Sequence, residues 1–127
     1  MQNQRQKIGQ VGEDIAEDYL KKKGYKILDR NFKTKWGELD IVASHKKAII
    51  FVEVKTLRQA QGRPSEFLPE DEITFHKASQ LQKMTQIYLS AKNLALDIDQ
   101  QIDIIAIEFN NINDYIIRHT ENAIGDY

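Results

Sequence analysis

The chain has 127 residues, of which 41% are hydrophobic and 29% charged, and it carries a formal net charge of −1. This length suits one domain spanning residues 1–127 with a core of its own, and it excludes two full domains. The chain contains no cysteine, which excludes disulfides, thiolate metal sites and cysteine nucleophiles. A sequence pI near 6.3 excludes a strongly basic nucleic-acid coat protein.

Nothing in the sequence indicates export or membrane insertion. No apolar run approaches the ~20 residues needed to cross a bilayer. Residues 1–10, MQNQRQKIGQ, lack the apolar segment of a signal peptide. We therefore expect a cytoplasmic protein that has no membrane partner.

The small net charge hides an uneven distribution along the chain. Residues 1–65 contain 14 Lys and Arg against 8 Asp and Glu, whereas residues 66–127 contain 4 against 11. A basic half favours a polyanionic partner such as nucleic acid. Uneven surface charge without any such partner is the ordinary alternative.

Helix and strand patterns alternate along the chain. Residues 6–23 are typical of an amphipathic helix that stops at Gly24, because five apolar residues recur at helical spacing: Ile8, Val11, Ile15, Tyr19 and Leu20. The later patterns predict strands at 25–32, 38–44 and 47–56, a helix at 73–92, and strands at 99–109 and 114–120. This order predicts an α/β fold, with a mixed sheet and helices packed against it.

A long polar stretch, LRQAQGRPSEFLPEDE at residues 57–72, separates the third strand from the second helix. It is longer than most connections inside a compact domain, which indicates either a functional loop or a mobile one. We expect substrate contacts in this loop.

The strand at residues 47–56 carries two charges in an otherwise apolar run. Side chains alternate between the faces of a strand, so Glu53 and Lys55 share a face with Ile49 and Phe51. Both faces begin apolar, which is typical of a central strand covered on both sides. Burying either charge alone would cost several kcal/mol. The two charges must therefore offset that cost for one another, or a third charge or a metal ion must do so.

Asp40 on the preceding strand is the candidate for a third charge. A two-residue turn at His45 and Lys46 would pair Asp40 with Phe51, diagonal to Glu53, and directly paired residues point to the same face. A four-residue loop gives the same pairing. A loop of odd length would turn Asp40 to the opposite face.

Two carboxylates and an ammonium group at the end of a hairpin are typical of a metal site. Oxygen ligands without cysteine or a histidine cluster suit Mg²⁺ or Mn²⁺. The metal would keep Asp40 and Glu53 ionised and activate water, while Lys55 could position that water or stabilise negative charge developing at phosphorus. The alternative is a purely structural ion network of the same three residues.

Charged residues on the two helices could join this site. Lys77 is spaced at helical intervals from Leu81 and Met84, which places it on the apolar stripe facing the sheet. It either extends its ammonium group to water or reaches the site. Glu13 follows Gly12, which would let the first helix approach the sheet closely, although periodicity alone favours a solvated Glu13.

Taken together, these residues resemble a known family. The motif G-x-x-G-E-x-x-A-x-x-Y-L at Gly9–Leu20 is similar to the opening of the YraN-like proteins, a bacterial group described as predicted endonucleases. The likeness continues through GYKILDRNF, WGELDIV and FVEVKT, and then through Lys77, Tyr88–Ala91, Asp103 and the RHTENA segment at Arg118–Ala123. It covers nearly the whole chain.

The resemblance implies a restriction-endonuclease-like fold with an αβββαβ core, a mixed central sheet flanked by helices and a D…ExK site, similar to that of archaeal Holliday-junction resolvases. By this resemblance Asp40 and Glu53 are the metal ligands, the carbonyl of Val54 helps to bind the metal, and Lys55 is the catalytic lysine. Glu13 matches a helix glutamate that some relatives direct at the site.

The resemblance also implies supporting residues. Glu38, in the Gly-Glu-x-Asp motif, could be a further ligand or a neighbour of the ligands, and the pairing above would set it opposite Glu53. Lys77 is expected beside the site. One departure is that an Arg is expected about two residues after the catalytic lysine. Leu57 stands there and Arg58 follows, so Arg58, one position later than expected, would have to bind the phosphate.

Three other residues of the likeness carry no assigned chemistry. Asp103 alternates onto a face with Ile105 and Ile107, which is consistent with a structural buried acid. His119 and Asn122 fit the family motif, and the chain continues Glu-Asn-Ala-Ile where an aromatic residue is expected at the last position.

Three functions compete. The first is a Mg²⁺- or Mn²⁺-dependent nuclease that hydrolyses phosphodiester bonds in nucleic acid, with DNA expected first and a homodimer suggested by symmetry. The second is a nucleic-acid-binding module without cleavage that acts with a partner enzyme. The third is a structural domain whose charges form a buried network. The residues do not distinguish DNA from RNA or an internal cut from an end cut.

Overall fold

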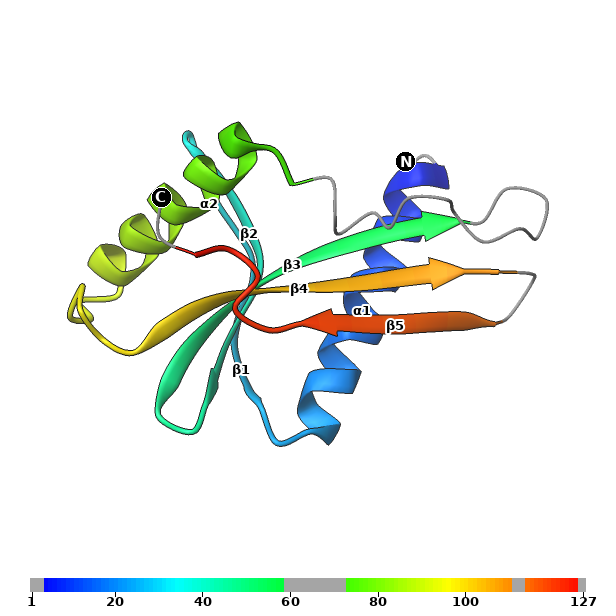
Figure 1. The fold of residues 1–127 in the computed structure, drawn as a ribbon, viewed down its shortest axis with the longest axis horizontal. Helices are drawn as coiled ribbons and strands as arrows, with labels where there is room; N and C mark the ends of the chain where they lie inside the picture. Colours follow the sequence, from blue (N-terminus) through cyan, green and yellow to red (C-terminus); the bar gives the residue numbers. More distant parts are fainter. Residues whose placement is uncertain (1–3, 59–72, 111–113, 126–127) are drawn as a thin grey trace.

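The computed structural model describes residues 4–58, 73–110 and 114–125. Its elements follow the predicted order of one helix, three strands, a second helix and two strands (Figure 1). Their bounds are α1 Gln4–Lys22, β1 Lys26–Thr34, β2 Gly37–His45, β3 Ala48–Arg58, α2 Phe75–Ala91, β4 Gln100–Phe109 and β5 Tyr115–Thr120.

The strands form one mixed sheet in the order β1-β2-β3-β4-β5. Neighbours pair antiparallel except β3 and β4, which are parallel because α2 carries the chain across between them. Figure 1 shows α1 behind β3, β4 and β5, while α2 lies toward β2 on the other side of the sheet. This confirms the predicted α/β class and matches the expected αβββαβ core with one strand added at the edge.

Both faces of the sheet are covered, and β3 contributes to two separate cores. Phe51 is 1% exposed and packs under α2, together with Met84 and Tyr88. Ile50 and Val52 pack under α1, together with Leu20. The predicted burial of this strand on both faces is therefore confirmed.

The two helices each turn an apolar side to the sheet. α1 buries Ala16 and Leu20, and α2 buries the predicted stripe that includes Leu81 and Met84. Within the described part of the chain, no helix is long and apolar enough to cross a membrane.

Gly12 sets the distance between α1 and β3. A methyl group at this position would meet the side chain of Thr56 at its Oγ1, Cγ2 and Cβ atoms. The close approach expected from the sequence is thus present, and it brings the first half of α1 down onto the end of β3.

Replacing Gly12 by alanine is expected to lower the free energy of unfolding by roughly 1–3 kcal/mol, because α1 must move away from Thr56 to admit the methyl group. Thermal or urea unfolding followed by circular dichroism measures the change. Thr56→Ala in the same chain should restore part of the loss, whereas Gly9→Ala, whose methyl group meets no atom within 4 Å, should cost nothing.

The β2–β3 hairpin turns one residue later than predicted. His45 pairs with Ala48, so the turn consists of Lys46 and Lys47, both in the left-handed region with φ of 50° and 70°, as two-residue hairpin turns require. The register is therefore shifted by two residues, and the predicted pairing of Asp40 with Phe51 is wrong. Phe51 pairs with Val42.

Candidate functional site

The candidate site lies where β2 leaves β3. The β2–β3 register runs only to Ile41 opposite Val52, whereas β1 and β2 stay paired as far as Thr34 opposite Gly37. In place of a backbone partner on β2, the side chain of Asp40 accepts a hydrogen bond of 2.8 Å from the Val54 amide. The carboxylate thus bridges the opening between the two strands.

The alternation of faces along β2 breaks at Asp40. Ile41 packs under α1 but Leu39 packs under α2, although two residues apart on a regular strand share a face. Asn31, on β1 beside this point, has a left-handed φ of 52°. The predicted placement of Asp40 on the face of Glu53 is wrong for this reason, since Asp40 lines a cavity below α1.

That cavity has a volume of about 460 Å³ and lies between the start of α1 and the end of β3. It brings together two of the predicted acids with residues from three elements. Its lining is Ile8, Gly9, Glu13, Asp40, Val54, Thr56, Leu57 and Arg58. The shifted Arg58 therefore does reach the site.

Glu13 is half-buried and presents its carboxylate to this cavity. Its Oε1 atom is buried and has no hydrogen-bond partner among the described residues. Burial raises the pKa of Glu13, the guanidinium of Arg30 opposes that rise, and nearby carboxylates that include Glu53 add to it. The solvated Glu13 that periodicity favoured is not what the structure shows.

The pKa of Asp40 is strongly raised. Burial, followed by repulsion from Glu53, raises the pKa of Asp40 to about 7, and the hydrogen bond from the Val54 amide only partly opposes this. Glu13 and Glu38 add smaller repulsions. Glu13, Glu38, Asp40 and Glu53 therefore lie close enough for their charges to interact.

Glu53 is held between two lysines. Its side chain is 9% exposed, and its Oε1 lies 3.5 Å from the Nζ of Lys77 on α2 and 3.8 Å from the Nζ of Lys55. The side chains of both lysines are about one-third exposed. Lys77 thus reaches Glu53 from α2, which packs on the same face of the sheet, and the two lysines offset the cost of burying Glu53.

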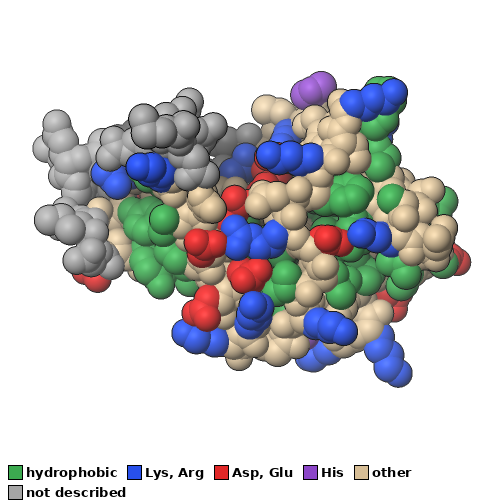
Figure 2. Space-filling model, turned by 180° about the vertical axis from the view of Figure 1, so that it is seen from behind, with side chains coloured by type: hydrophobic (Ala, Val, Ile, Leu, Met, Phe, Trp, Pro, Cys, Tyr) green, Lys and Arg blue, Asp and Glu red, His purple; other side chains and the backbone are tan. Residues whose placement is uncertain are grey.

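Glu38 lies at the outer edge of the cluster. It is exposed, and its Oε2 is 3.8 Å from the Nζ of Lys33 on β1. The prediction that it sits opposite Glu53 is wrong, because β2 pairs only with β1 at this point. On the face over which α1 runs, acidic and basic side chains lie next to one another across the middle (Figure 2).

A second group of titratable side chains lies between β4 and β5. Within residues 4–58, 73–110 and 114–125, Asp103, His119 and Glu121 bring three potential metal-ligand atoms within 4.8 Å of one another. This group could hold a metal ion. The atoms of Glu13, Asp40 and Glu53 do not meet that distance criterion.

The polar atoms of this second group already have protein partners. The Nε2 of His119 is 2.7 Å from Asp103 Oδ2, and its Nδ1 is 3.0 Å from the hydroxyl of Tyr19. Asp103 Oδ1 accepts from the Asn122 amide at 2.9 Å and from Gln101 Nε2 at 2.8 Å. These bonds explain how Asp103 can be fully buried, and they fit the structural acid predicted from its alternation.

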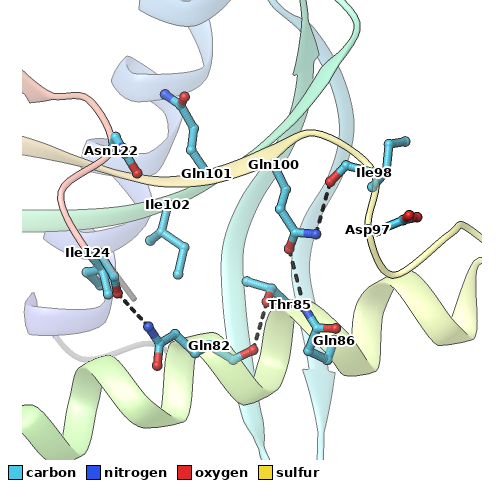
Figure 3. Close-up of a pocket in the computed structure, with 11 residues that line it drawn as sticks. Gln82, Thr85, Gln86, Asp97, Ile98, Gln100, Gln101, Ile102, Asn122 and Ile124 are labelled. Carbon is cyan, nitrogen blue, oxygen red and sulfur yellow. Dashed lines mark hydrogen bonds between the residues drawn. The ribbon is translucent and has the colours of Figure 1, made fainter. Parts of the chain in front are cut away.

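A larger cavity, of about 740 Å³, lies between α2 and the start of β4. Among the described residues that line it, none is a predicted site residue and Asp97 is the one with a charge. Figure 3 shows its amide side chains bonded to their surroundings, with Gln82 Nε2 2.7 Å from the Gly125 carbonyl and Gln86 Nε2 3.3 Å from Gln100 Oε1. This cavity has the amides to hold a polar molecule.

The model of a known protein family matches most of this chain. The model of the uncharacterised protein family UPF0102 matches residues 12–107, a span that includes every acid and lysine of the candidate site. The chain belongs to the UPF0102 family. The resemblance to the YraN-like proteins drawn from the sequence motifs is thereby confirmed.

Two relatives show how far this membership extends. The UPF0102 protein of Caldanaerobacter subterraneus subsp. tengcongensis is 43% identical over 103 residues, which cover 81% of this chain and 80% of the relative. That of Clostridium botulinum strain Loch Maree is 41% identical over 118 residues, covering 91% and 92%.

One solved structure, described as Pyrococcus furiosus SfsA in complex with Ca²⁺, is a more distant match to this UPF0102 chain. The identity is 18% and the TM-score 0.41, and the match covers 92% of this chain and 63% of that chain.

Proposed function

We propose that this UPF0102 protein is a metal-dependent nuclease that hydrolyses phosphodiester bonds of nucleic acid, with DNA as the first substrate to test. The observation that supports it is the convergence of buried carboxylates and cationic side chains where β2 leaves β3. Asp40 and Glu13 face a cavity whose rim holds Arg58, and Glu53 lies beside Lys55. Acids with excess negative charge next to cations suit a metal and a phosphate.

The donor atoms are all oxygens, the ligand type that a hard divalent cation prefers. Carboxylate oxygens of Asp40, Glu53 and Glu13 would hold Mg²⁺ or Mn²⁺, with the carbonyl of Val54 as a further oxygen ligand. The buried Oε1 of Glu13 has no hydrogen-bond partner among the described residues, and burial and repulsion from Glu53 raise the pKa of Asp40; both support a cation at this position. A bound divalent ion supplies Lewis-acid stabilisation of phosphoryl oxygens and lowers the pKa of a bound water.

The chain's own residues would then divide the remaining work. Lys55 would orient the attacking water or stabilise the negative charge that develops on the phosphoryl oxygens. Lys77 holds Glu53 from α2 and thereby fixes the direction of its carboxylate. Arg58 at the cavity rim would bind a phosphate of the substrate strand.

A non-catalytic nucleic-acid-binding module that acts with a partner enzyme is the second candidate. The observation in its favour is that Lys55 and Lys77 already neutralise Glu53 without any metal. This candidate requires binding that weakens with salt and no cleavage products under any divalent metal.

The deciding experiment is a cleavage screen with fluorescent DNA, as single strands, duplexes, flaps and four-way junctions, and with RNA. Each substrate is incubated with Mg²⁺ or Mn²⁺ and either wild-type protein or Glu53→Gln. Products from the wild type alone support the nuclease. Binding without products under either metal supports the second candidate, and neither binding nor products rejects both.

A nuclease with one site per chain needs a second copy to cut both strands of a duplex together. We therefore include a homodimer in the proposal, on grounds of symmetry. Light scattering with and without a duplex substrate measures the oligomeric state, and a monomer under both conditions rejects it.

A further inference from the structure

Trp36 is exposed where β1 turns into β2, and it is the one tryptophan of the chain. It is 50% exposed, and it belongs to neither core cluster. The Nζ of Lys83 lies 4.0 Å from the centre of its ring, and that of Lys35 lies 5.0 Å away. An accessible indole with two ammonium groups beside it combines a stacking surface with phosphate-binding charges.

The backbone beneath this ring is held by α2. The carbonyl of Trp36 accepts a hydrogen bond of 3.3 Å from Gln80 Nε2, and its amide donates to Thr34 Oγ1 at 3.1 Å. Gly37 has a φ of 146°, and a methyl group there would lie 3.0 Å from Gln80 and 3.4 Å from Met84. The turn is therefore packed closely against the helix, which presents the ring in a defined place.

The same helix connects this turn to the candidate site. Lys77, which contacts Glu53, is followed on α2 by Gln80 and Lys83 at steps of three residues. Each step turns about 60° around the helix axis, so Lys83 lies about 120° from Lys77, on the exposed side of α2. With a rise of 1.5 Å per residue, Lys83 lies roughly 9 Å beyond Lys77 along the axis. A single bound strand can span that distance.

We propose that Trp36, Lys35 and Lys83 form a stacking platform for an unpaired nucleotide of the strand whose backbone enters the site at Asp40 and Glu53. The proposal rests on the proposed function, and it names the substrate class as nucleic acid with a single-stranded segment. An incoming base takes the place of an ammonium group on the ring, and the displaced lysine pairs with the adjacent phosphate.

The specificity follows from what duplexes and single strands expose. In an intact duplex the faces of the bases are stacked on one another, so no face is free for an indole ring. Unpaired bases in single strands, overhangs and flaps have free faces, and stacking on an aromatic side chain is tolerant of sequence. The platform therefore selects for strand structure and not for sequence.

The fluorescence of Trp36 tests the proposal directly, because no other tryptophan contributes to the signal. Wild-type protein in EDTA, and Glu53→Gln in Mg²⁺, are titrated with single-stranded, overhanging and blunt duplex DNA and with single-stranded RNA. We expect saturable quenching with single strands and overhangs, and at least fivefold weaker binding of the blunt duplex. Equal quenching by the blunt duplex, or none with any single strand, overturns the platform.

Variants separate stacking from charge in an anisotropy assay with labelled single strands. Trp36→Ala is expected to weaken binding by at least about fivefold, with partial recovery in Trp36→Phe. Lys83→Ala should reduce the slope of log affinity against log salt by about 0.7. Tyr115→Ala on β5, which removes an exposed aromatic at the opposite edge of the sheet, and Lys26→Ala are the matched controls.

The two proposals can fail separately. If single strands quench Trp36 and Trp36→Ala weakens their binding, but the wild type yields no cleavage products, the platform is kept and the nuclease is rejected. Cleavage with unchanged binding by Trp36→Ala would keep the nuclease and reject the platform. RNA that quenches as DNA does supports a platform that does not distinguish the sugar.

Discussion

Glu53→Gln is expected to lower the rate of phosphodiester cleavage by about 10³-fold, while the protein remains folded. Glutamine keeps the shape of the side chain but removes the negative charge that would hold the metal at this position. Stability should change little, because the side chains of Lys55 and Lys77 are about one-third exposed and their ammonium groups can be hydrated when their partner is neutral. Single-turnover cleavage with labelled substrate in Mg²⁺ measures the rate, and thermal unfolding verifies the fold.

Glu17→Gln is the matched control for this prediction. Glu17 is also a carboxylate with a lysine partner, since Lys21 Nζ lies 3.3 Å from its Oε2, but it lies outside the cavity. Its variant should cleave at the wild-type rate. Cleavage by a purified Glu53→Gln preparation at more than a tenth of the wild-type rate would remove Glu53 from the proposed mechanism.

Asp40→Asn is expected to stabilise the metal-free protein at pH 8 by roughly 2–4 kcal/mol. In the folded protein the pKa of Asp40 is raised from its ordinary 3.8 to about 7, so the folded state binds this proton more tightly than the unfolded state does. The contribution of Asp40 to stability is therefore most favourable below pH 4 and is lost as the pH rises toward 7. Asparagine removes the ionisation and can still accept the Val54 amide hydrogen bond.

Urea unfolding in EDTA between pH 4 and pH 8 measures this effect. The two proteins should have similar stability near pH 4, and the advantage of Asp40→Asn should grow up to about pH 7. Divalent metal should reverse the order, because a metal stabilises the ionised carboxylates of the wild type. Glu38→Gln, an exposed acid of the same cluster, should show a much smaller change, and a pH-independent difference for Asp40→Asn would contradict the role of its ionisation.

The elements of the fold were predictable because their patterns are local. The apolar stripe and the turn signals around residues 73–92 predicted a helix that the structure places at Phe75–Ala91. The double-sided apolar run of residues 47–56 predicted a central strand, and Phe51 and Val52 do enter different cores. The position of Lys77 on the helical stripe left two alternatives, and its contact with Glu53 decides between them.

The register of the hairpin was not predictable from the same kind of pattern. Turns at His45–Lys46 and at Lys46–Lys47 have the same length. Their registers differ by two residues, so both put the same side chains on the same face of the sheet. The packing of Val42 beside Phe51 under α2 selects one of them. Register depends on contacts with another element, and the strand alone does not contain that information.

The remaining differences between the predictions and the structure come from contacts between residues that are distant in the sequence. Tyr19 reads as one more apolar residue of α1, yet its hydroxyl meets His119, 100 positions further on. Glu13 reads as a solvated residue, yet the glycine before it lets α1 approach Thr56, and one oxygen of its carboxylate is buried. No local pattern distinguishes a buried acid from an exposed one at the border of a helix face.

The sequence by itself determined the elements, their order and family, and which residues carry the charges of an acidic site with lysines, because these follow from periodicity, composition and ordered motifs. The tertiary structure decided how those charges meet. It separates β2 from β3 at the residues before Ile41 and breaks the alternation of side-chain faces at Asp40. It also places Glu13 over the opening between the two strands. Two helices packed on opposite faces impose that geometry, and such packing depends on the whole sheet at once.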